Sequence, residues 1–284
     1  MVDINRRSNQ KNRVFSRPAY NSAWFFAQHP VFTVADFAAA VPERGRIGNH
    51  TLLVHHLNAG HIIRVRRGLY AAVPPGTEAE NFVVDPYLIA AKAAPDAIIA
   101  YHSALSFHGL AYSVRQVVTY LTTLEDCKTF SFQGVTYQAV QHPRALLKKQ
   151  KETSFVDKQD YRGQYVSVTS QERTLVDTLD RITLSGGPEE VWRSLATITY
   201  LKIEEVIAYV SLLDNSTTAA KVGLFLQQQQ KHLLFADEKL APLEQLKPRA
   251  PRYMFRSKQK GKLISRWNLI VPEEIMQPEW EEVM

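Results

Sequence analysis

Residues 48–74 read GNHTLLVHHLNAGHIIRVRRGLYAAVP, and this stretch decides how the first quarter of the chain folds. Its first half places Leu53 and Leu57 at helical spacing behind Asn49, a residue type that favours the N-cap position. Gly60 supplies the stop that commonly follows the last turn of a helix. The pattern therefore predicts a short helix that starts near Asn49 and closes at Gly60.

The second half of the stretch predicts a β-hairpin. Residues 62–65 and 69–73 are β-prone runs, and Gly68 between them can take the positive φ of a tight turn. Arg66 and Arg67 lie at the tip of this hairpin. A helix that leads directly into an arginine-tipped hairpin is typical of a winged helix-turn-helix, in which the hairpin forms the wing.

Two short helices are expected ahead of this stretch. Residues 19–28 hold a cluster of aromatic side chains that suits the buried face of a helix. Thr33 and Asp36 match a capping box, with Asp in place of the usual Glu or Gln, and the helix they open continues to Ala40 before Pro42 stops it. The expected order is helix, helix, recognition helix and wing.

This arrangement predicts contacts with duplex DNA, because an α-helix fits the major groove while flanking arginines neutralise phosphates. The two leucines must face the core, which leaves the polar side chains of the recognition helix for the bases. We expect base-edge contacts from Asn49, His50, Thr51 and His55. We expect phosphate contacts from Arg44 and Arg46 before the helix and from Arg64, Arg66 and Arg67 in the wing.

The histidines of this stretch are an alternative hint of a metal site. His50, His55, His56 and His61 avoid the i, i+4 spacing that places two ligands on one helix face, and no carboxylate or thiol lies near them in sequence. We therefore expect solvated or DNA-facing histidines, with no metal and no cofactor.

Charge is distributed unevenly along the chain. Residues 1–75 hold ten basic and three acidic side chains, whereas the rest of the chain holds 24 basic and 25 acidic ones, so the whole net charge of +6 comes from the first quarter. Such a distribution favours a phosphate-binding module joined to a neutral domain, although a solvated basic surface would give the same count. No apolar run approaches the ~20 residues that span a bilayer, so no membrane role is expected.

The chain carries a single cysteine, Cys127, which excludes an internal disulfide and suits a reducing compartment. The first residues, MVDINRR, lack the apolar core of a secretion signal. We therefore expect a cytoplasmic protein.

The length of 284 residues favours two domains in an α+β fold. We expect a basic flexible arm over 1–17, a winged helix-turn-helix over 18–75, and a linker over 76–80 that begins with the sequence Gly-Thr-Glu. Residues 81–284 should form a larger mixed domain with strands in its first part and helices from about residue 170 onward.

A second basic segment lies near the C-terminus. Residues 247–266 hold eight basic side chains and no acidic one, and we expect residues 252–256 and 263–270 to pair as a hairpin across Gly261. This segment is either a solvated hairpin or a second binding surface for nucleic acid or an acidic protein. The candidate residues are Arg252, Arg256, Lys258, Lys260, Lys262 and Arg266.

Five separate stretches together resemble one family. They are RVRRGLY at 64–70, ALSFHGL at 104–110, ERTLVD at 172–177, the glycine pair 186–187 ahead of VW at 191–192, and SRWNLIVP at 265–272. In this order they resemble the AbiEi antitoxins, and the resemblance runs from the wing almost to the C-terminus. Residues 1–17 depart from it.

The resemblance implies an N-terminal winged helix that binds inverted repeats upstream of its own operon and represses it. It also implies a C-terminal antitoxin domain that counters a nucleotidyltransferase-like AbiEii toxin in abortive infection and phage defence, or in plasmid and island maintenance. Family members oppose the toxin without requiring a stable complex, so a direct toxin partner stays open. Winged helices on inverted repeats commonly act in pairs, but no stretch of the sequence marks a dimer interface, so a dimer on DNA stays open.

Two other classes of protein compete with this interpretation. Asp96, Asp126 and Lys128 match the sparse motif of metal-dependent nucleases, in which two carboxylates hold the metal ion and a lysine supports the transition state. Asp96 precedes its expected strand, however, and no other catalytic motif is present, so we expect no enzyme. The third class is a winged-helix transcription factor whose larger domain senses a ligand without any toxin partner.

Overall fold

In a computed structural model of the chain, the structure describes residues 22–42, 45–255 and 260–276. It is 45% helical and 20% strand, and it confirms the predicted α+β class. No helix of these residues is both long and apolar enough to cross a bilayer. The predicted basic arm, residues 1–17, lies outside the described ranges.

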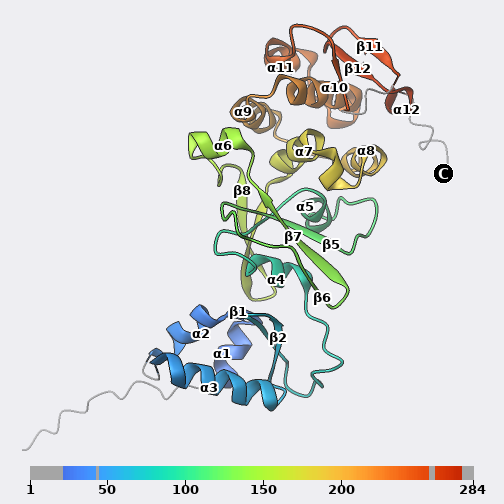
Figure 1. Cartoon of the computed structure of the whole chain (residues 1–284). Helices are drawn as coiled ribbons and strands as arrows, with labels where there is room; N and C mark the ends of the chain where they lie inside the picture. The colour runs from blue at the N-terminus through green and yellow to red at the C-terminus, as the bar shows by residue number, and fades with distance from the viewer. Residues whose placement is uncertain (1–21, 43–44, 256–259, 277–284) are drawn as a thin grey trace, which may run out of the picture.

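The first unit has the element order of a winged helix (Figure 1). Its elements are α1 (Ser22–Gln28), β1 (Val31–Thr33), α2 (Val34–Ala40), α3 (Gly45–Asn58), β2 (Ile62–Arg66) and β3 (Leu69–Ala72). The strands form an antiparallel sheet in the order β1-β3-β2, so the predicted hairpin is confirmed. Gly68 lies in the hairpin turn with φ of +83°, as its turn position requires. The short strand β1 was not predicted.

Local sequence sets the start of α2. The Thr33 hydroxyl accepts a hydrogen bond from the Asp36 amide at 3.1 Å, and the Asp36 carboxylate accepts one from the Thr33 amide at 2.8 Å. Both bonds of the predicted capping box are therefore present. Helix α3 starts at Gly45, four residues earlier than predicted, so Asn49 lies inside the helix and is not its cap.

A six-stranded sheet forms the middle of the molecule, in the order β6-β7-β5-β4-β9-β8. Its strands are β4 (Ile98–Ile99), β5 (Val117–Thr122), β6 (Phe130–Phe132), β7 (Val135–Gln141), β8 (Val156–Tyr161) and β9 (Gln164–Thr169). Two pairs are parallel, β5 with β7 and β4 with β9, and the others are antiparallel. Helices α4 (Pro86–Ala91), α5 (His102–Phe107) and α6 (Arg144–Lys149) belong to the same part of the chain.

The chain turns helical after β9, as predicted. The elements are α7 (Gln171–Asp180), η2 (Ile182–Ser185), α8 (Pro188–Ala196), α9 (Ile203–Leu213), α10 (Ser216–Leu233), η3 (Asp237–Leu240) and α11 (Ala241–Leu246). The centre of this part is a buried ion pair on α7, in which Arg173 Nε lies 3.1 Å from Asp177 Oδ2. Arg173 also donates to two backbone carbonyls, and the Tyr209 hydroxyl donates to Asp177 at 2.7 Å. These contacts satisfy charges that would otherwise be costly to bury.

A small sheet closes the C-terminal end of the molecule. It contains β10 (Arg252–Tyr253), β12 (Leu269–Val271) and β11 (Lys262–Ile264) in the order β10-β12-β11, followed by α12 (Glu273–Met276). The predicted hairpin across Gly261 is wrong, because β10 runs parallel to β12 and the hairpin joins β11 to β12. Trp267, in the turn of that hairpin, is fully buried and donates to the Gln227 side chain at 2.6 Å, which fixes the turn on α10.

The packing of Trp267 on α10 makes a prediction about Gly223. A Cβ added at Gly223 would lie 2.2 Å from the indole ring of Trp267. Alanine favours helices over glycine by about 1 kcal/mol, but overpacking of this kind costs about 1–3 kcal/mol. We expect Gly223→Ala to lower the free energy of unfolding in urea. In a Trp267→Leu background the same change should be neutral or stabilising, and a gain in stability in the wild-type background would contradict the packing.

Candidate nucleic-acid interface

Helix α3 presents one face to solvent along its whole length. After Gly45, its exposed residues recur at helical spacing, and they are Arg46, Ile47, His50, Thr51, Val54, His55 and Asn58. Ile47 is 84% exposed, an unusual position for a branched apolar side chain. In Figure 1, α3 runs along one end of the molecule, with the six-stranded sheet on the other side of its own unit. Nothing in the described part of the chain covers this face, so a duplex can approach it.

Asn49 does not belong to the exposed face, so its expected base contact must be corrected. Because α3 begins at Gly45, Asn49 shares the inward face with Leu53 and His56, at spacings of four and seven residues. Its side chain is 4% exposed, and its oxygen has no hydrogen-bond partner among the described residues. His50, Thr51 and His55 remain exposed, as a base-reading role requires. The Thr51 hydroxyl donates back to the Ile47 carbonyl at 3.1 Å.

His56 is a core residue and not the solvated side chain that the sequence suggested. Its Nε2 lies 2.9 Å from the Ser22 hydroxyl, and its Nδ1 lies 3.1 Å from Nδ1 of His61. Burial, with the neighbouring histidines, lowers the pKa of His56. Within the described ranges, no three His, Cys, Asp or Glu side chains gather to hold a metal ion.

Exposed arginines occur both on α3 and in the wing. Arg46, Arg64 and Arg67 are exposed, whereas Arg44 lies outside the described residues. Arg64 stacks on Tyr70, its guanidinium carbon 5.8 Å from the ring centre, and this contact can hold the side chain at the surface. The acidic side chain of the described winged helix, Asp36, is engaged in its capping box and in a 3.0 Å ion pair with Lys92.

Arg66 is folded inward, so its expected phosphate contact must also be corrected. Its guanidinium carbon lies 4.5 Å from the centre of the Phe130 ring, and Nη2 donates to the carbonyl of Ala93. The pairing of β2 with β3 shifts register between Arg64 and Arg66, and irregularities of this kind redirect side chains. Arg66 therefore joins the wing to the six-stranded sheet and to the turn after α4.

Apolar packing reinforces this connection. Val65, Leu69 and Ala71 of the wing belong to the same buried cluster as Val84 and Leu88 from the larger part of the chain. The predicted linker, residues 76–80, lies between two segments whose buried side chains are in one continuous cluster. The winged helix is thus packed against the rest of the molecule.

The second basic segment keeps only some of its predicted surface charges. Arg252, Lys260 and Lys262 are exposed, while Arg256 and Lys258 lie outside the described residues. Arg266 must be corrected, because it pairs with Asp237 at 2.8 Å and with Glu244 at 2.6 Å. Hydrogen bonds that Arg266 donates to Asp237 and Glu244 raise the pKa of Arg266, and its charge is compensated within the chain.

The residues of the nuclease motif have separate surroundings. Asp96 accepts hydrogen bonds from the Thr122 hydroxyl at 2.5 Å and from the Thr123 amide at 2.6 Å, which join the start of β4 to the end of β5. Burial raises the pKa of Asp96, but these bonds together lower it below its usual value. Asp126 and Lys128 are exposed in the loop after β5. The hydrogen bonds of Asp96 to Thr122 and Thr123 give this residue a structural role in joining the two strands.

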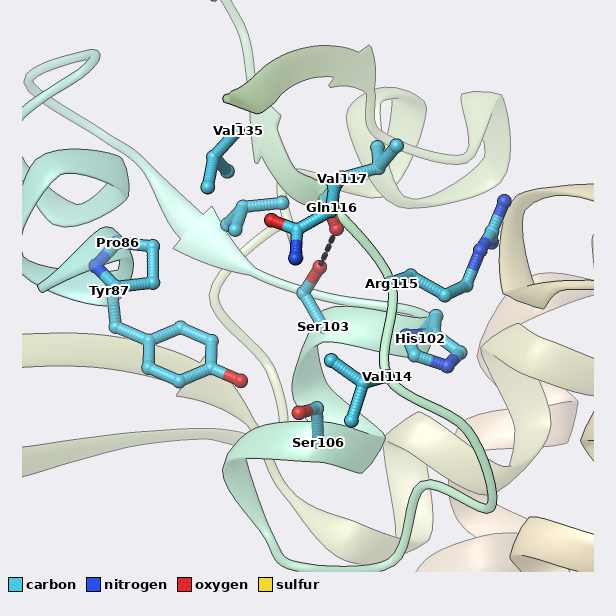
Figure 2. A pocket seen from close by; sticks show the side chains of 11 residues that line it. Pro86, Tyr87, His102, Ser103, Ser106, Val114, Arg115, Gln116, Val117 and Val135 are labelled. Atoms are coloured by element: carbon cyan, nitrogen blue, oxygen red, sulfur yellow. Dashed lines mark hydrogen bonds between the residues drawn. The ribbon is translucent and has the colours of Figure 1, made fainter. Parts of the chain in front are cut away.

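A cavity of about 230 Å³ lies beside α5 (Figure 2). Tyr87, Ser106 and Val114 face it, with His102 and Arg115 at one side. Burial and the nearby Arg115 guanidinium lower the pKa of His102, although Glu190, 3.2 Å away, acts in the opposite direction.

Two polar groups of this cavity are already occupied within the protein. The Ser103 hydroxyl donates to one strand carbonyl and accepts from one strand amide, while His102 is bound to Glu190. Sequence reasoning did not single out this cavity, because its walls come from segments distant in the chain.

Sequence reasoning also missed Ile47 and Val54, the apolar members of the exposed α3 face. A helix started at Gly45 would have included Ile47, and the helical spacing of Val54 from His50 already placed Val54 on the same face. Apolar side chains on a recognition helix can contact the methyl group of thymine.

Comparisons with known proteins show a likeness to solved structures. No protein-family model matches the chain, and no curated protein matches its sequence. A crystal structure of the RV2827C protein from Mycobacterium tuberculosis is similar, with a TM-score of 0.52 and 15% identity over 88% of this chain and 89% of that chain. At this identity the likeness shows the fold, which that protein shares over nearly its whole length.

The inward position of Arg66 makes a prediction about stability. Arg66→Met removes a stacked cation and a hydrogen bond to a carbonyl, and we expect a loss of about 1–3 kcal/mol in the free energy of unfolding. Arg67→Met, the matched change at an exposed arginine next to it, should stay within about 0.5 kcal/mol of wild type. Urea denaturation measures both, and equal stability of the two variants would contradict the interface.

Proposed function

We propose that this protein is a DNA-binding antitoxin that represses its own operon and counteracts a nucleotidyltransferase-like toxin. The observation that carries the DNA-binding part is the uncovered face of α3 in a winged-helix arrangement, together with three exposed arginines, Arg46 on α3 and Arg64 and Arg67 in the wing. In this proposal α3 enters the major groove, where Ile47, His50, Thr51 and His55 meet base edges. Arg46, Arg64 and Arg67 meet phosphates.

The proposed DNA site is an inverted repeat bound by two copies of the chain. A winged helix reads one half-site, and two-fold symmetric protein pairs match palindromic operators whose half-sites are about 34–36 Å apart. The packing of the wing on the larger domain supports a fixed orientation of α3 relative to the rest of each copy. Half-site spacing is then set by the way in which two copies meet.

Support for the antitoxin part comes from the resemblance to the AbiEi family, whose stretches occupy structural positions in this chain. Residues 172–177 include the buried pair Arg173–Asp177, and residues 265–272 include the buried Trp267. Buried residues of this kind stabilise the fold and are not available to a partner. We infer that the toxin is countered through surface residues outside these stretches or beside them, and we propose no catalytic role for the chain.

A ligand-sensing transcription factor is the second candidate, and the cavity beside α5 favours it (Figure 2). Its walls combine apolar and polar side chains, as small-molecule sites do, but its volume of about 230 Å³ is below the usual range of about 300–1,000 Å³. Ser103 and His102 already have hydrogen-bond partners within the protein. These two side chains therefore need no ligand in the cavity. The antitoxin proposal therefore ranks first.

Substitutions in the wing and in α3 should separate phosphate contacts from base reading. Arg64→Gln with Arg67→Gln should weaken binding to all duplex sequences and flatten the dependence of log K on log salt by about 0.9 for each lost phosphate contact. Ile47→Ala or His50→Ala should instead reduce discrimination between operator and unrelated DNA.

Titration of fluorescent operator and scrambled duplexes at several salt concentrations measures both effects. Arg144→Gln with Lys148→Gln on α6 is the matched control, since it removes two exposed cations away from the winged helix. If the slope of log K against log salt is the same in the Arg64/Arg67 variant as in wild type, the proposed phosphate contacts are wrong.

The antitoxin part predicts protection in cells. Co-expression of the chain with the nucleotidyltransferase-like protein encoded beside it should restore growth that this protein alone arrests. An Arg64→Gln/Arg67→Gln variant should still protect when it is expressed from an independent promoter, because protection and operator binding use different surfaces. Absence of such a neighbouring gene, or growth arrest despite co-expression of the intact chain, would refute the antitoxin assignment and favour the sensor.

A further inference from the structure

Two branched apolar side chains lie along the middle of the exposed face of α3. Ile47 is 84% exposed and Val54 is 40% exposed. Seven residues separate them, which is close to two turns of a helix with 3.6 residues per turn, so both lie near one line along its length. Thr51, one turn after Ile47, lies beside this line. The face therefore has an apolar row at its centre, formed by Ile47 and Val54.

The polar groups of the face lie beside this row or are already bonded. His50 and His55 lie on opposite sides of it, because each residue turns the helix by about 100°. The Thr51 hydroxyl donates to the Ile47 carbonyl, so its proton is not available to a base, whereas its methyl group is. Asn58 is the last residue of α3, one turn beyond Val54. Methyl groups therefore dominate the centre of the face.

Packing within the protein does not account for the row. The inward face of α3 is formed by Asn49, Leu53 and His56, which are buried, and the row lies on the opposite side of the helix. Single apolar side chains are common at protein surfaces, but two that are aligned on a recognition helix lie where that helix meets its target. The row is therefore placed to contact a bound molecule.

The charge of the same unit favours DNA as that molecule. Arg46, next to Ile47, is exposed, as are Arg64 and Arg67 in the wing, and none of the three has an ion pair among the described residues. The acidic side chain of the described winged helix, Asp36, is paired with Lys92. An uncompensated positive unit suits a polyanion. In the major groove of DNA, thymine is the base that presents a methyl group, and apolar side chains contact it.

We propose that Ile47 and Val54 read the methyl groups of two thymines in each operator half-site, on either strand and about three base pairs apart. The rise of 1.5 Å per residue places these side chains about 10.5 Å apart along a helix that follows the groove, and three base-pair steps of about 3.4 Å span nearly the same length. This inference rests on the DNA-binding part of the proposed function and is independent of its antitoxin part.

The test removes single methyl groups from the DNA. The full chain first selects its preferred duplex from a random-sequence library, and each thymine of that duplex is then replaced in turn by deoxyuridine, which keeps the base pair and lacks the methyl group. Kd is measured for wild type, Ile47→Ala and Val54→Ala. Alanine favours helices, so α3 is retained in both variants. Arg64→Gln with Arg67→Gln is the control for phosphate contacts.

The selected half-sites should contain two thymines with the proposed spacing, and deoxyuridine at either one should weaken Kd by about fourfold, as the exposure of one apolar carbon does. Ile47→Ala should abolish the effect of deoxyuridine at one of these positions, and Val54→Ala should abolish it at the other. The Arg64/Arg67 variant should bind thymine and deoxyuridine duplexes more weakly by the same factor, because phosphate contacts carry no sequence information.

Equal Kd for thymine and deoxyuridine duplexes at every position would overturn the reading of thymine and leave DNA binding intact. The same holds if Ile47→Ala and Val54→Ala keep the full effect of deoxyuridine. If the chain enriches no duplex from the library, both this inference and the DNA-binding part of the proposed function are refuted. Sedimentation equilibrium without DNA tests another occupant: a dimer that Ile47→Ala converts to monomers would show that a second copy covers the row, and would overturn the inference.

Discussion

The guanidinium of Arg66 packs 4.5 Å from the Phe130 ring and donates to the Ala93 carbonyl, so the wing is attached to the middle of the molecule. The ion pair between Lys92 and Asp36 adds a second connection nearby, and the buried cluster that contains Val65 and Leu88 fills the space between the two parts. The orientation of α3 depends on this interface, because α3 packs on the sheet that carries Arg66. A winged helix held in this way presents its recognition helix in a fixed direction.

The interface also decides which residues remain for DNA. One of the three wing arginines is used internally, and two stay at the surface. The exposed face of α3 gains Ile47 and Val54 and loses Asn49. The proposed DNA-binding surface therefore carries less positive charge and more apolar side chains than the sequence predicted.

Features with strong local signals could be predicted from the sequence. The capping box at Thr33 and Asp36 and the turn at Gly68 depend on neighbouring residues alone, and both are present. The α+β class followed from the change of periodicity near residue 170. Features set by distant contacts could not be predicted. The pairing of Arg266 with Asp237 joins residues 29 positions apart, and the inward turn of Arg66 needs Phe130.

Errors in element boundaries had a larger effect on the candidate site than errors in element type. Starting α3 at Asn49 rather than Gly45 assigned a buried residue to the bases, because a shift of four residues moves the expected cap into the body of the helix. At the C-terminus, Trp267 is buried against α10, and this contact fixes the turn of the hairpin at residues 265–268. Strand propensity alone does not determine which residues form that turn.

The most direct test of the DNA-binding claim is site-directed cleavage of operator DNA. An iron chelate is attached to a cysteine introduced by His50→Cys on α3, in a Cys127→Ser background, and the positions of strand cleavage are mapped. We predict cleavage centred in the major groove of each half-site, with none from the same chelate attached at Lys262→Cys in the C-terminal sheet. Cleavage from the sheet position, with none from α3, would contradict the claim that α3 reads DNA.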